Sequence, residues 1–487
     1  MKVLFLFPLM DNTLRNSTLA DAERYRLTWL ERPSDLHTPV RLFLALRGRG
    51  HQVCLLESAE GPDRIARYSF LALDPVDKFT ATDGDAHHQL QQLANQARTP
   101  EAPSFLPPFR GGWIGYLPYE WATSLEKRVP QAKQDPWNLP MAEFHLFETV
   151  LAFDHAAQRL ILMTSCKEAG DFESSTALLE TLLEEIETSH PAVKGFQLLG
   201  DGPTSNMDRE TFEAGVTQLQ EAIAEGEIFQ AVLSQRFSQK FEGDPFALYR
   251  ALRLTNPSPH MFYFEASGIT LVGSSPERLV SVKSGRVENR PIAGTRARGM
   301  DEAEDDRLGA ELLADTKEKA EHAMLVDLAR NDLGRVARFG TVEVKENMAL
   351  EKFARVQHLV SRVECDLASD QTPMDALAAS FPAGTVSGAP KIRAMELLAG
   401  IEPETRGPYA GAFGYLDSSG NLDMAITIRT FVVREDTVSV QAGAGIVFDS
   451  RPAREYEETL EKADALFLAL RLAGSRAFTP AGLEVAK

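Results

Sequence analysis

The clearest pattern of hydrophobic and polar positions begins after Asp208. Apolar residues follow it at helical spacing and stop before Gly226: Phe212, Val216, Leu219 and Ile223. Residues three and four positions apart share one helix face, and Asp is a favoured N-cap, so we predict a helix here. The apolar run after it predicts a strand over residues 228–237.

Farther along, residues 411–448 alternate β-rich runs with turn segments at 417–421 and 434–436. This pattern predicts an antiparallel meander. Helical patterns flank it at 373–380, 390–399 and 454–472. Antiparallel strands with segregated helices are typical of an α+β fold.

The first part of the chain carries weaker signals. It mixes short β-like runs at 52–56 and 159–163 with an acidic helix pattern at 174–187. Changes in composition predict seams at 99–108, 128–140 and 189–208. We therefore expect an N-terminal region, residues 1–190, packed on a catalytic domain at 208–472.

Composition narrows the class of protein. The chain has 487 residues and lacks an apolar run of about 18 residues that could span a bilayer. Its net charge of −19 argues against binding to nucleic acid or anionic membranes, which requires a basic surface. The three cysteines have no metal-site or disulfide spacing. We expect a cytoplasmic protein.

Two acidic helices offer candidate metal ligands. Helical spacing places Glu318 and Glu321 on one face, and Glu455, Glu458 and Lys462 on a face of the C-terminal helix. If the helices meet, the glutamates could supply the oxygen ligands that Mg²⁺ prefers. Spacing alone favours a simpler interpretation, in which both are solvated faces of acidic helices.

Three glycine-rich segments, at 291–295, 382–391 and 441–445, surround these helices. The second leads into a helix at Pro390, where backbone N–H groups and Thr385 can accept a carboxylate. It lacks the spacing of a phosphate P-loop. Taken singly, each segment is equally well explained as a structural turn.

Together these segments resemble the catalytic subunits of anthranilate synthases, within the chorismate-utilising enzymes. The resemblance runs through residues 208–472 and is thinner before them, at 55–58 and 67–70. It implies a large two-lobed αββα sandwich of antiparallel sheets with helices outside. The matching sequence segments occur in the family's order: 291–295, 321–332, 381–391, 407–415, 428–430, 443–445 and 455–459.

The resemblance implies a site for Mg²⁺ and the two carboxylates of chorismate. Glu321 and Glu458 are implied as direct metal ligands, with Glu318 and Glu455 close by, partly through water. The metal would bind the ring carboxylate. Residues implied to hold the enolpyruvyl carboxylate and complete the anion cage are Thr385, Tyr409, Arg429, Gly443, Ala444, Gly445 and Lys462.

The same resemblance implies the catalytic residues. Glu277 matches the general acid that protonates the departing 4-hydroxyl, which requires its pKa to be raised. An ordinary salt bridge to Arg278 is the alternative. His358 matches the active-site histidine that contacts the leaving hydroxyl, although a lone histidine beside apolar residues is more often a core residue. Thr295 is implied as a further catalytic residue beside Glu277 and His358.

Two positions indicate the nucleophile and the product. Relatives that add water carry a lysine base where this chain has Gln230, and a neutral amide cannot deprotonate water, whereas ammonia has its own lone pair. Para-aminating relatives often carry a nucleophilic lysine at the position of Ala293. The expected reaction converts chorismate and ammonia to anthranilate and pyruvate.

The resemblance also implies feedback inhibition by tryptophan and a glutaminase partner. The residues implied in the inhibitor pocket are Leu56, Glu57, Ser58, Pro259, Met261 and Tyr415. His260 stands where relatives usually have an aromatic residue. Because no glutaminase region follows Leu472, we expect a hetero-oligomer in which a glutamine amidotransferase subunit supplies ammonia. An aminodeoxychorismate synthase component and a catalytically inactive tryptophan-binding regulator are the rival interpretations.

Overall fold

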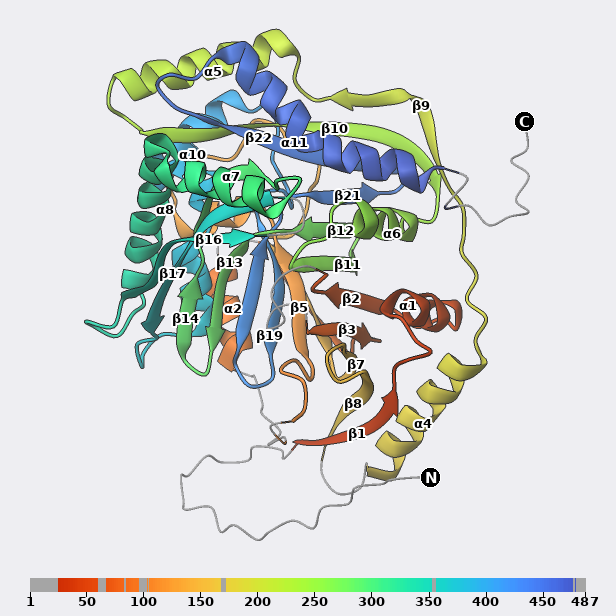
Figure 1. Ribbon diagram of the computed structural model, residues 1–487. Helices are drawn as coiled ribbons and strands as arrows, with labels where there is room; N and C mark the ends of the chain where they lie inside the picture. Colours follow the sequence, from red (N-terminus) through yellow and green to blue (C-terminus); the bar gives the residue numbers. More distant parts are fainter. Residues whose placement is uncertain are drawn as a thin grey trace.

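The computed structural model describes residues 25–59, 67–82, 85–95, 103, 105–167, 172–352, 356–475 and 478. Two large antiparallel sheets pack face to face, and helices cover their outer faces (Figure 1). The predicted α+β class and the αββα sandwich are both confirmed. None of the helices in this part of the chain is long and apolar enough to cross a membrane.

The first sheet joins strands from both halves of the chain. Its twelve strands are β1 (Tyr25–Pro33), β2 (Val53–Glu57), β3 (Tyr68–Leu73), β7 (Thr149–Asp154), β8 (Arg159–Lys167), β9 (Phe196–Ser205), β10 (Gln230–Gly243), β11 (His260–Ala266), β12 (Ile269–Ser275), β18 (Gly388–Ala389), β21 (Thr430–Arg434) and β22 (Thr437–Ile446). Their order is β1-β8-β7-β3-β2-β11-β12-β21-β22-β10-β18, with β9 beside β10. The two halves meet where β2 pairs with β11.

The second sheet is built in the same way. Its ten strands are β4 (Asp77–Ala81), β5 (Gly112–Leu117), β6 (Ala142–Phe147), β13 (Arg278–Lys283), β14 (Arg286–Asn289), β15 (Ile292–Ala297), β16 (Glu343–Lys352), β17 (Val356–Asp366), β19 (Ala412–Asp417) and β20 (Leu422–Ile426). The order is β15-β17-β14-β13-β20-β19-β5-β6-β4, with β16 beside β17. Here β5 of the first half pairs with β19 of the second.

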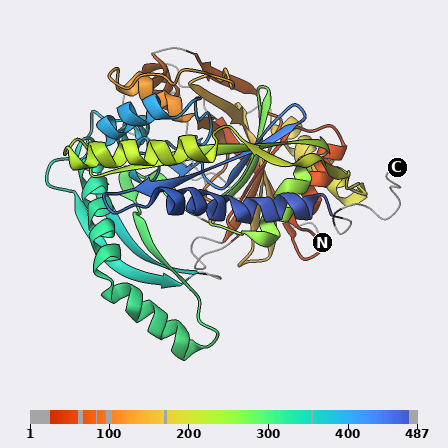
Figure 2. The same cartoon turned by 90° about the horizontal axis from the view of Figure 1, so that it is seen from above.

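Helices pack on each sheet according to their apolar faces. Those over the first sheet are α1 (Pro39–Gly48), α4 (Phe172–Thr188), α6 (Phe246–Thr255) and α11 (Pro452–Ala473). Those over the second are α2 (Ala86–Asn95), α3 (Ala122–Leu125), α8 (Thr316–Gly334) and α9 (Pro373–Ser380). The others are α5 (Arg209–Ala224), α7 (Glu302–Ala314), α10 (Lys391–Ile401) and the 3₁₀ helices η1 (Tyr119–Trp121) and η2 (Gly384–Val386). Figure 2 shows α5 and α11 side by side.

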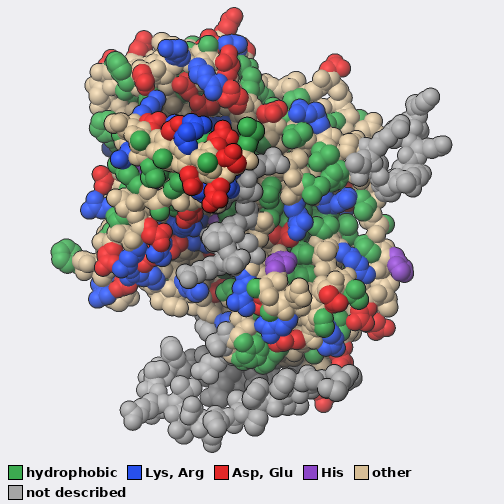
Figure 3. Space-filling model, viewed as in Figure 1, with side chains coloured by type: hydrophobic (Ala, Val, Ile, Leu, Met, Phe, Trp, Pro, Cys, Tyr) green, Lys and Arg blue, Asp and Glu red, His purple; other side chains and the backbone are tan. Residues whose placement is uncertain are grey.

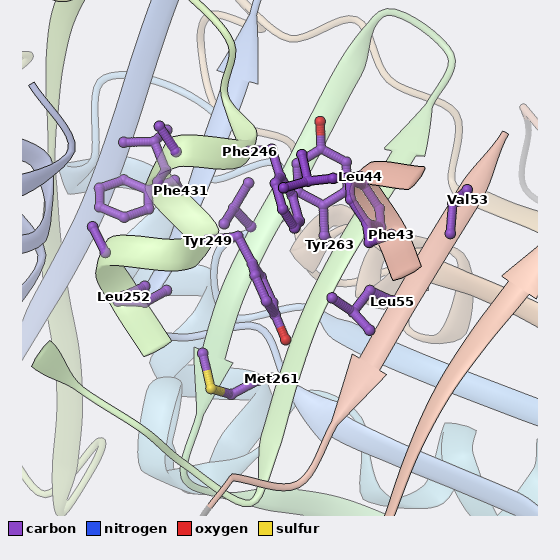
Figure 4. Close-up of a cluster of buried hydrophobic side chains, with 14 of the residues drawn as sticks. Phe43, Leu44, Val53, Leu55, Phe246, Tyr249, Leu252, Met261, Tyr263 and Phe431 are labelled. Carbon is purple, nitrogen blue, oxygen red and sulfur yellow. The ribbon is translucent and has the colours of Figure 1, made fainter. Parts of the chain in front are cut away.

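The core over the first sheet is aromatic where the two halves meet (Figure 4). The rings of Phe43 on α1 and Phe246 on α6 stack at 3.9 Å, and the ring of Tyr263 on β11 meets both edge-on. Burying such large side chains contributes roughly 1.5–3 kcal/mol each relative to exposure. This shared core holds residues from before 190 and after 208 in one body.

Charged side chains of both signs are interspersed over the face drawn in Figure 3. This face carries no continuous basic patch. Side chains of both signs are expected on the surface of a chain with 51 basic and 70 acidic residues.

Most helices lie where the sequence predicts them. Asp208 caps α5 by accepting a hydrogen bond from the Thr211 amide, as expected. The helix predicted at 373–380 has these bounds in α9. The helix predicted at 390–399 is α10, which starts one residue later and ends two residues later, and the helix predicted at 454–472 is α11, which is two residues longer at its start and one at its end. The strand predicted at 228–237 is β10, which starts at Gln230 and runs on to Gly243.

The predicted single meander over 411–448 is wrong. Strands β19 and β20 belong to the second sheet, whereas β21 and β22 belong to the first. The chain crosses between the sheets at residues 427–429, and Arg429 has a positive φ of 49° there. Local alternation identifies strands and turns, but which sheet a strand joins depends on partners far away in sequence.

Candidate active site

Two crossings between the sheets bring the central residues of the candidate site together. One joins β20 to β21 through Arg429, and the other joins β12 to β13 through Glu277. The Ile426 amide donates to the Glu277 carbonyl over 3.0 Å, and the Ser274 amide donates to the Arg429 carbonyl over 3.1 Å. These backbone bonds hold the two crossings side by side.

The carboxyl group of Glu277 has the environment of a general acid. It accepts a hydrogen bond from the Thr385 hydroxyl over 3.0 Å. Burial raises its pKa to about 7, and the opposing effects of the Thr385 hydrogen bond and the Arg429 charge are smaller. At neutral pH a large fraction of such a group holds a proton that it can donate.

The alternative salt bridge between Glu277 and Arg278 is not what the structure contains. Arg278 pairs instead with Asp423 and Glu288, each at 2.9 Å. Strand β13, which starts at Arg278, pairs with β20, which carries Asp423, and with β14, which carries Glu288. The guanidinium is therefore occupied by carboxylates of these two strands. The sequence left this choice open, and the neighbours of β13 in the sheet decide it.

His358 and Thr295 lie opposite each other on β17 and β15. The Thr295 hydroxyl is 3.1 Å from His358 Nδ1, and the Gly294 carbonyl oxygen is 2.9 Å from the same nitrogen. Since a carbonyl only accepts, Nδ1 carries a proton in this geometry. His358 is half-buried, so the structure does not place it among the core residues.

Strands β10 and β22 bring Gln230 and Tyr409 against a glycine backbone. A Cβ on Gly443 would lie 3.0 Å from the Tyr409 hydroxyl, and one on Gly445 would lie 2.8 Å from the Gln230 amide nitrogen. These glycines therefore permit a close approach that a larger residue would block. Ala444 between them is fully buried in the core beneath α5 and α10.

Lys462 on α11 reaches this backbone. Its ammonium donates to the Gly443 carbonyl over 3.0 Å and pairs with Glu458 at 2.8 Å. The residues expected to bind substrate therefore come from five separated segments, at Thr385, Tyr409, Arg429, β22 and Lys462 of α11. The structure brings Thr385 to Glu277, and Tyr409 and Lys462 to Gly443.

The four candidate metal ligands lie on α8 and α11. Burial first, then the charges of Glu318, Asp449 and Glu458, raise the pKa of Glu321. Burial and the Glu458 charge raise the pKa of Glu455. Negative charges from the two helices thus face one another at a distance over which they repel.

These carboxylates do not form a closed set of ligands. In the described ranges, no group of three or more His, Cys, Asp or Glu side chains is placed to hold a metal ion. Glu458 has Lys462 as a partner, and Arg296 lies 3.6 Å from Glu318. Mg²⁺ commonly takes one or two protein carboxylates and fills its other positions with water and substrate oxygens, so the donors that are present fit it.

The two segments expected to form the inhibitor pocket are neighbours. Strand β2 pairs with β11 so that Glu57 lies opposite Met261 and Leu56 opposite Phe262. The Ser258 carbonyl, in the loop that contains Pro259, accepts a hydrogen bond from the Ala59 amide over 3.0 Å. Sequence reasoning placed these segments together, and the sheet aligns them directly.

Glu57 is already engaged inside the protein. Its buried carboxylate accepts hydrogen bonds from the Tyr249 hydroxyl, from Arg253 at 3.0 Å and from Ser69 at 3.3 Å. The Ser58 hydroxyl is buried as well, and it has no hydrogen-bond partner among the described residues. A polar ligand that reached this place would find an unused hydroxyl at Ser58.

His260 and Tyr415 lie in the space between the sheets. Burial lowers the pKa of His260 to about 4, with Asp423 acting in the opposite direction. Burial raises the pKa of Tyr415, which also feels Asp423. Both side chains therefore border the same carboxylate, and His260 is uncharged at neutral pH.

Comparison with known proteins identifies the family. A family model described as chorismate binding enzyme matches residues 51–468. This chain belongs to that family. Among relatives of the family, anthranilate synthase component 1 of Thermus thermophilus is 45% identical, over 92% of this chain and 98% of that protein. The same component of Acetivibrio thermocellus is 41% identical over 91% and 94%.

Solved structures of chorismate binding enzymes agree. Anthranilate synthase component I from Streptococcus pneumoniae has a TM-score of 0.72 at 38% identity and covers 82% of this chain and 92% of its own. The isochorismate synthase MenF from Escherichia coli has a TM-score of 0.71 at 21% identity, over 92% and 94%. The second likeness concerns the fold alone.

Sequence reasoning missed a buried ion pair beside the site, between Glu402 and Arg406. Charged residues are seldom fully buried, and no periodicity marked these two. The only signal in the sequence was that Glu402 and Arg406 stand just before the segment 407–415, which resembles the family.

Proposed function

We propose that this chain is the catalytic subunit of an anthranilate synthase, a lyase that converts chorismate and ammonia to anthranilate, pyruvate and water. Ammonia adds at C2 of the ring, the double bonds shift, and the 4-hydroxyl leaves. The enolpyruvyl side chain is then eliminated as pyruvate. The observation that carries the proposal is the Glu277 carboxyl, whose pKa of about 7 suits the donation of a proton to the departing hydroxyl.

His358 acts on the same leaving group as Glu277, the 4-hydroxyl. With Nδ1 protonated toward the Gly294 carbonyl, its ring orientation is fixed by β15. A histidine held in one orientation and one protonation form can contact the leaving hydroxyl and assist the later loss of pyruvate. Thr295 contributes the second contact to the same nitrogen.

The nucleophile is ammonia because Gln230 supplies no base. Gln230 is the first residue of β10, and its side-chain amide lies against Gly445 of β22. A lysine would be needed at the position of Gln230 to activate water. Ala293, on β15 opposite Leu359, offers no amine for a covalent intermediate. The first observation supports amination, and the second supports the ortho product.

The two substrate carboxylates are held by different groups. Arg429 and Tyr409, with the backbone of β22, take the enolpyruvyl carboxylate, because a guanidinium offers a fixed pair of donors. Glu321 and Glu458 would hold Mg²⁺, with Glu318 and Glu455 nearby. When bound, the metal supplies a positive charge for the ring carboxylate.

Regulation and ammonia supply belong to the same proposal. Tryptophan binds beside Leu56, Glu57 and Ser58, against the loop with Pro259 and the start of β11 at Met261. A glutaminase subunit delivers ammonia to the chain in a hetero-oligomer. The curated relatives are each named as one component of a synthase, which supports the existence of a second component.

The test incubates the purified chain with chorismate, Mg²⁺ and ammonium at alkaline pH, and identifies the product by fluorescence and mass. We expect anthranilate and an equal amount of pyruvate. An aminated product that retains the pyruvyl group would identify an aminodeoxychorismate or amino-deoxyisochorismate synthase instead. An isochorismate product would show that water is the nucleophile, and no turnover at all would favour a regulatory protein.

A further inference from the structure

Arg406 is one of the largest fully buried side chains in the described chain, and it lies beside the candidate site. Its guanidinium donates to both carboxylate oxygens of Glu402, each over 2.7 Å. It also donates to two backbone carbonyls, those of Val386 on η2 and Val232 on β10, each again over 2.7 Å. One side chain thus ties together three segments that are distant in sequence.

The partners of Arg406 lead directly to residues assigned to the reaction. Val386 follows Thr385, whose hydroxyl donates to the Glu277 carboxyl over 3.0 Å. The guanidinium carbon lies 5.8 Å from the centre of the Tyr409 ring and 4.4 Å from that of Tyr119 on η1. The guanidinium is thus bonded to the residue after Thr385 and lies beside the Tyr409 ring.

Glu402 extends the arrangement to the glycine strand. Its carboxylate accepts the Ser234 amide over 2.9 Å and the Ser234 hydroxyl over 2.8 Å. That hydroxyl accepts a hydrogen bond from the Gln441 side chain over 2.9 Å. Ser234 lies opposite Gly443 in the β10–β22 ladder, so the network ends at the backbone beneath Tyr409.

The N-terminal half of the chain fixes the other side of Arg406. The carboxylate of Glu120 on η1 accepts the backbone amide of Arg406 over 2.7 Å and that of Gly407 over 3.1 Å. Both the backbone and the side chain of Arg406 are therefore constrained. This degree of constraint exceeds what filling space in a core requires.

Stability alone is a poor explanation for this buried pair. Removing two charges from water costs several kcal/mol per ion, which offsets most of their attraction, and apolar replacements are often neutral or stabilising. Lysine could balance the charge of Glu402 but could not bridge its two oxygens and two carbonyls at once, because it has one compact donor group. The planar fork of arginine is the feature that the geometry uses.

We propose that the Arg406–Glu402 pair is a positioning unit that holds Thr385 against Glu277 and Tyr409 against Gly443 for the reaction. The proposal rests on the proposed function, because it concerns the efficiency of that reaction. Arg406 lies beside the Tyr409 ring, and it reaches Thr385 only through the carbonyl of the next residue, Val386. Its effect on turnover therefore passes through these two residues.

The test is a double-mutant cycle on the full chain. Arg406→Lys should lower kcat/KM for ammonia-dependent product formation by roughly tenfold or more, since small misplacements of catalytic groups are costly. Thr385→Val removes the contact to Glu277 directly. If Arg406 acts through Thr385, the double variant should lose clearly less than the product of the two single losses. Arg307→Lys, in the exposed i,i+4 pair with Glu311, is the matched control and should leave activity unchanged.

Folding is measured separately by circular dichroism and thermal unfolding. If Arg406→Lys does not fold, the uncharged pair Glu402→Gln with Arg406→Gln takes its place in the cycle, because it leaves no unpaired buried charge. Wild-type kcat/KM in a folded variant, or losses that multiply in the double variant, would overturn the proposal. Absence of anthranilate from the unmodified chain would contradict the proposed function alone, and the cycle is then measured on the chorismate product that does form.

Discussion

At the scale of single residues, Glu277 combines a proposed catalytic role with a cost to the fold. Substituting it by Gln keeps the size of the side chain and removes the proton that the proposed mechanism requires. We expect kcat to fall by about 10²-fold or more, the usual contribution of a general acid. Product formation at saturating chorismate measures this loss, and a variant within threefold of wild type would remove Glu277 from the role.

The same substitution should stabilise the protein in alkaline solution. The pKa of this carboxyl is about 7 in the fold, against a usual value of 4.5. The folded state therefore binds its proton more tightly, a stabilisation that is complete below pH 4.5 and is lost as the pH rises through 7. That loss is spread between pH 4.5 and 7, so Glu277→Gln should gain roughly 2 kcal/mol more, relative to wild type, at pH 8.5 than at pH 5.5.

Thermal unfolding at the two pH values measures that gain. Glu213→Gln, at a surface ion pair with Arg209, is the control and should show no such pH dependence. An equal effect of Glu277→Gln at both pH values would mean that the carboxyl is not protonated in the folded state at neutral pH.

Glu458 tests the proposed metal site. Glu458→Gln should abolish Mg²⁺-dependent turnover and weaken Mg²⁺ binding measured by calorimetry, because an amide lacks the charge that holds the cation. Glu461→Gln, on the same helix and paired with Arg454 at the surface, is the matched control. Full activity or unchanged Mg²⁺ binding in Glu458→Gln would refute the assignment. Circular dichroism should show both variants folded.

At the scale of elements, α9 leads the chain to the loop that carries Thr385. Thr372 and Asp375 form a capping box at its start, in which each side chain accepts from the other's backbone amide. Thr372→Ala should lower the free energy of unfolding by about 1 kcal/mol, the usual value of an N-cap. Catalysis should be unchanged because α9 ends at Ser380, before Thr385.

Chemical denaturation measures this loss. Thr217→Ala makes the same chemical change in the exposed interior of α5, where alanine is the better helix former. That control should leave stability equal or slightly higher. A Thr372→Ala variant as stable as the control would mean that the box contributes nothing to α9.

The elements also mark where prediction from the sequence succeeds. Helices α5, α9, α10 and α11 follow from caps and from apolar spacing, which are local signals. The meander at 411–448 does not, because β19–β20 and β21–β22 have the local alternation of one sheet but pack into two. The partners that separate them, β5 and β12, lie far away in the sequence.

At the scale of the whole molecule, the β2–β11 pairing connects the first half of the chain to the catalytic half. Ser58 lies at this joint with a buried hydroxyl that no described residue uses. Ser58→Ala should weaken inhibition by tryptophan roughly tenfold, the value of about 1.4 kcal/mol for one hydrogen bond. Stability and uninhibited kcat should stay the same, since no hydrogen bond among the described residues is lost.

Enzyme assays over a range of tryptophan concentrations measure this change. Ser69→Ala is an informative comparison, because its hydroxyl donates to Glu57 and its loss disturbs an existing contact. Unchanged inhibition in Ser58→Ala would remove this residue from the proposed pocket, and inhibition absent from wild type would remove the pocket itself.

The sequence by itself determined the α+β class, most of the helices and the residues that resemble a chorismate site, because caps, periodicity and matched words are properties of neighbouring residues. Only the tertiary structure decided how the halves combine into two shared sheets and which carboxyl is buried beside Thr385. It also brought Arg406 to Glu402, Val386 and Val232. Burial, and hence the raised pKa of Glu277, depends on atoms contributed by segments more than a hundred residues apart, which no local pattern encodes.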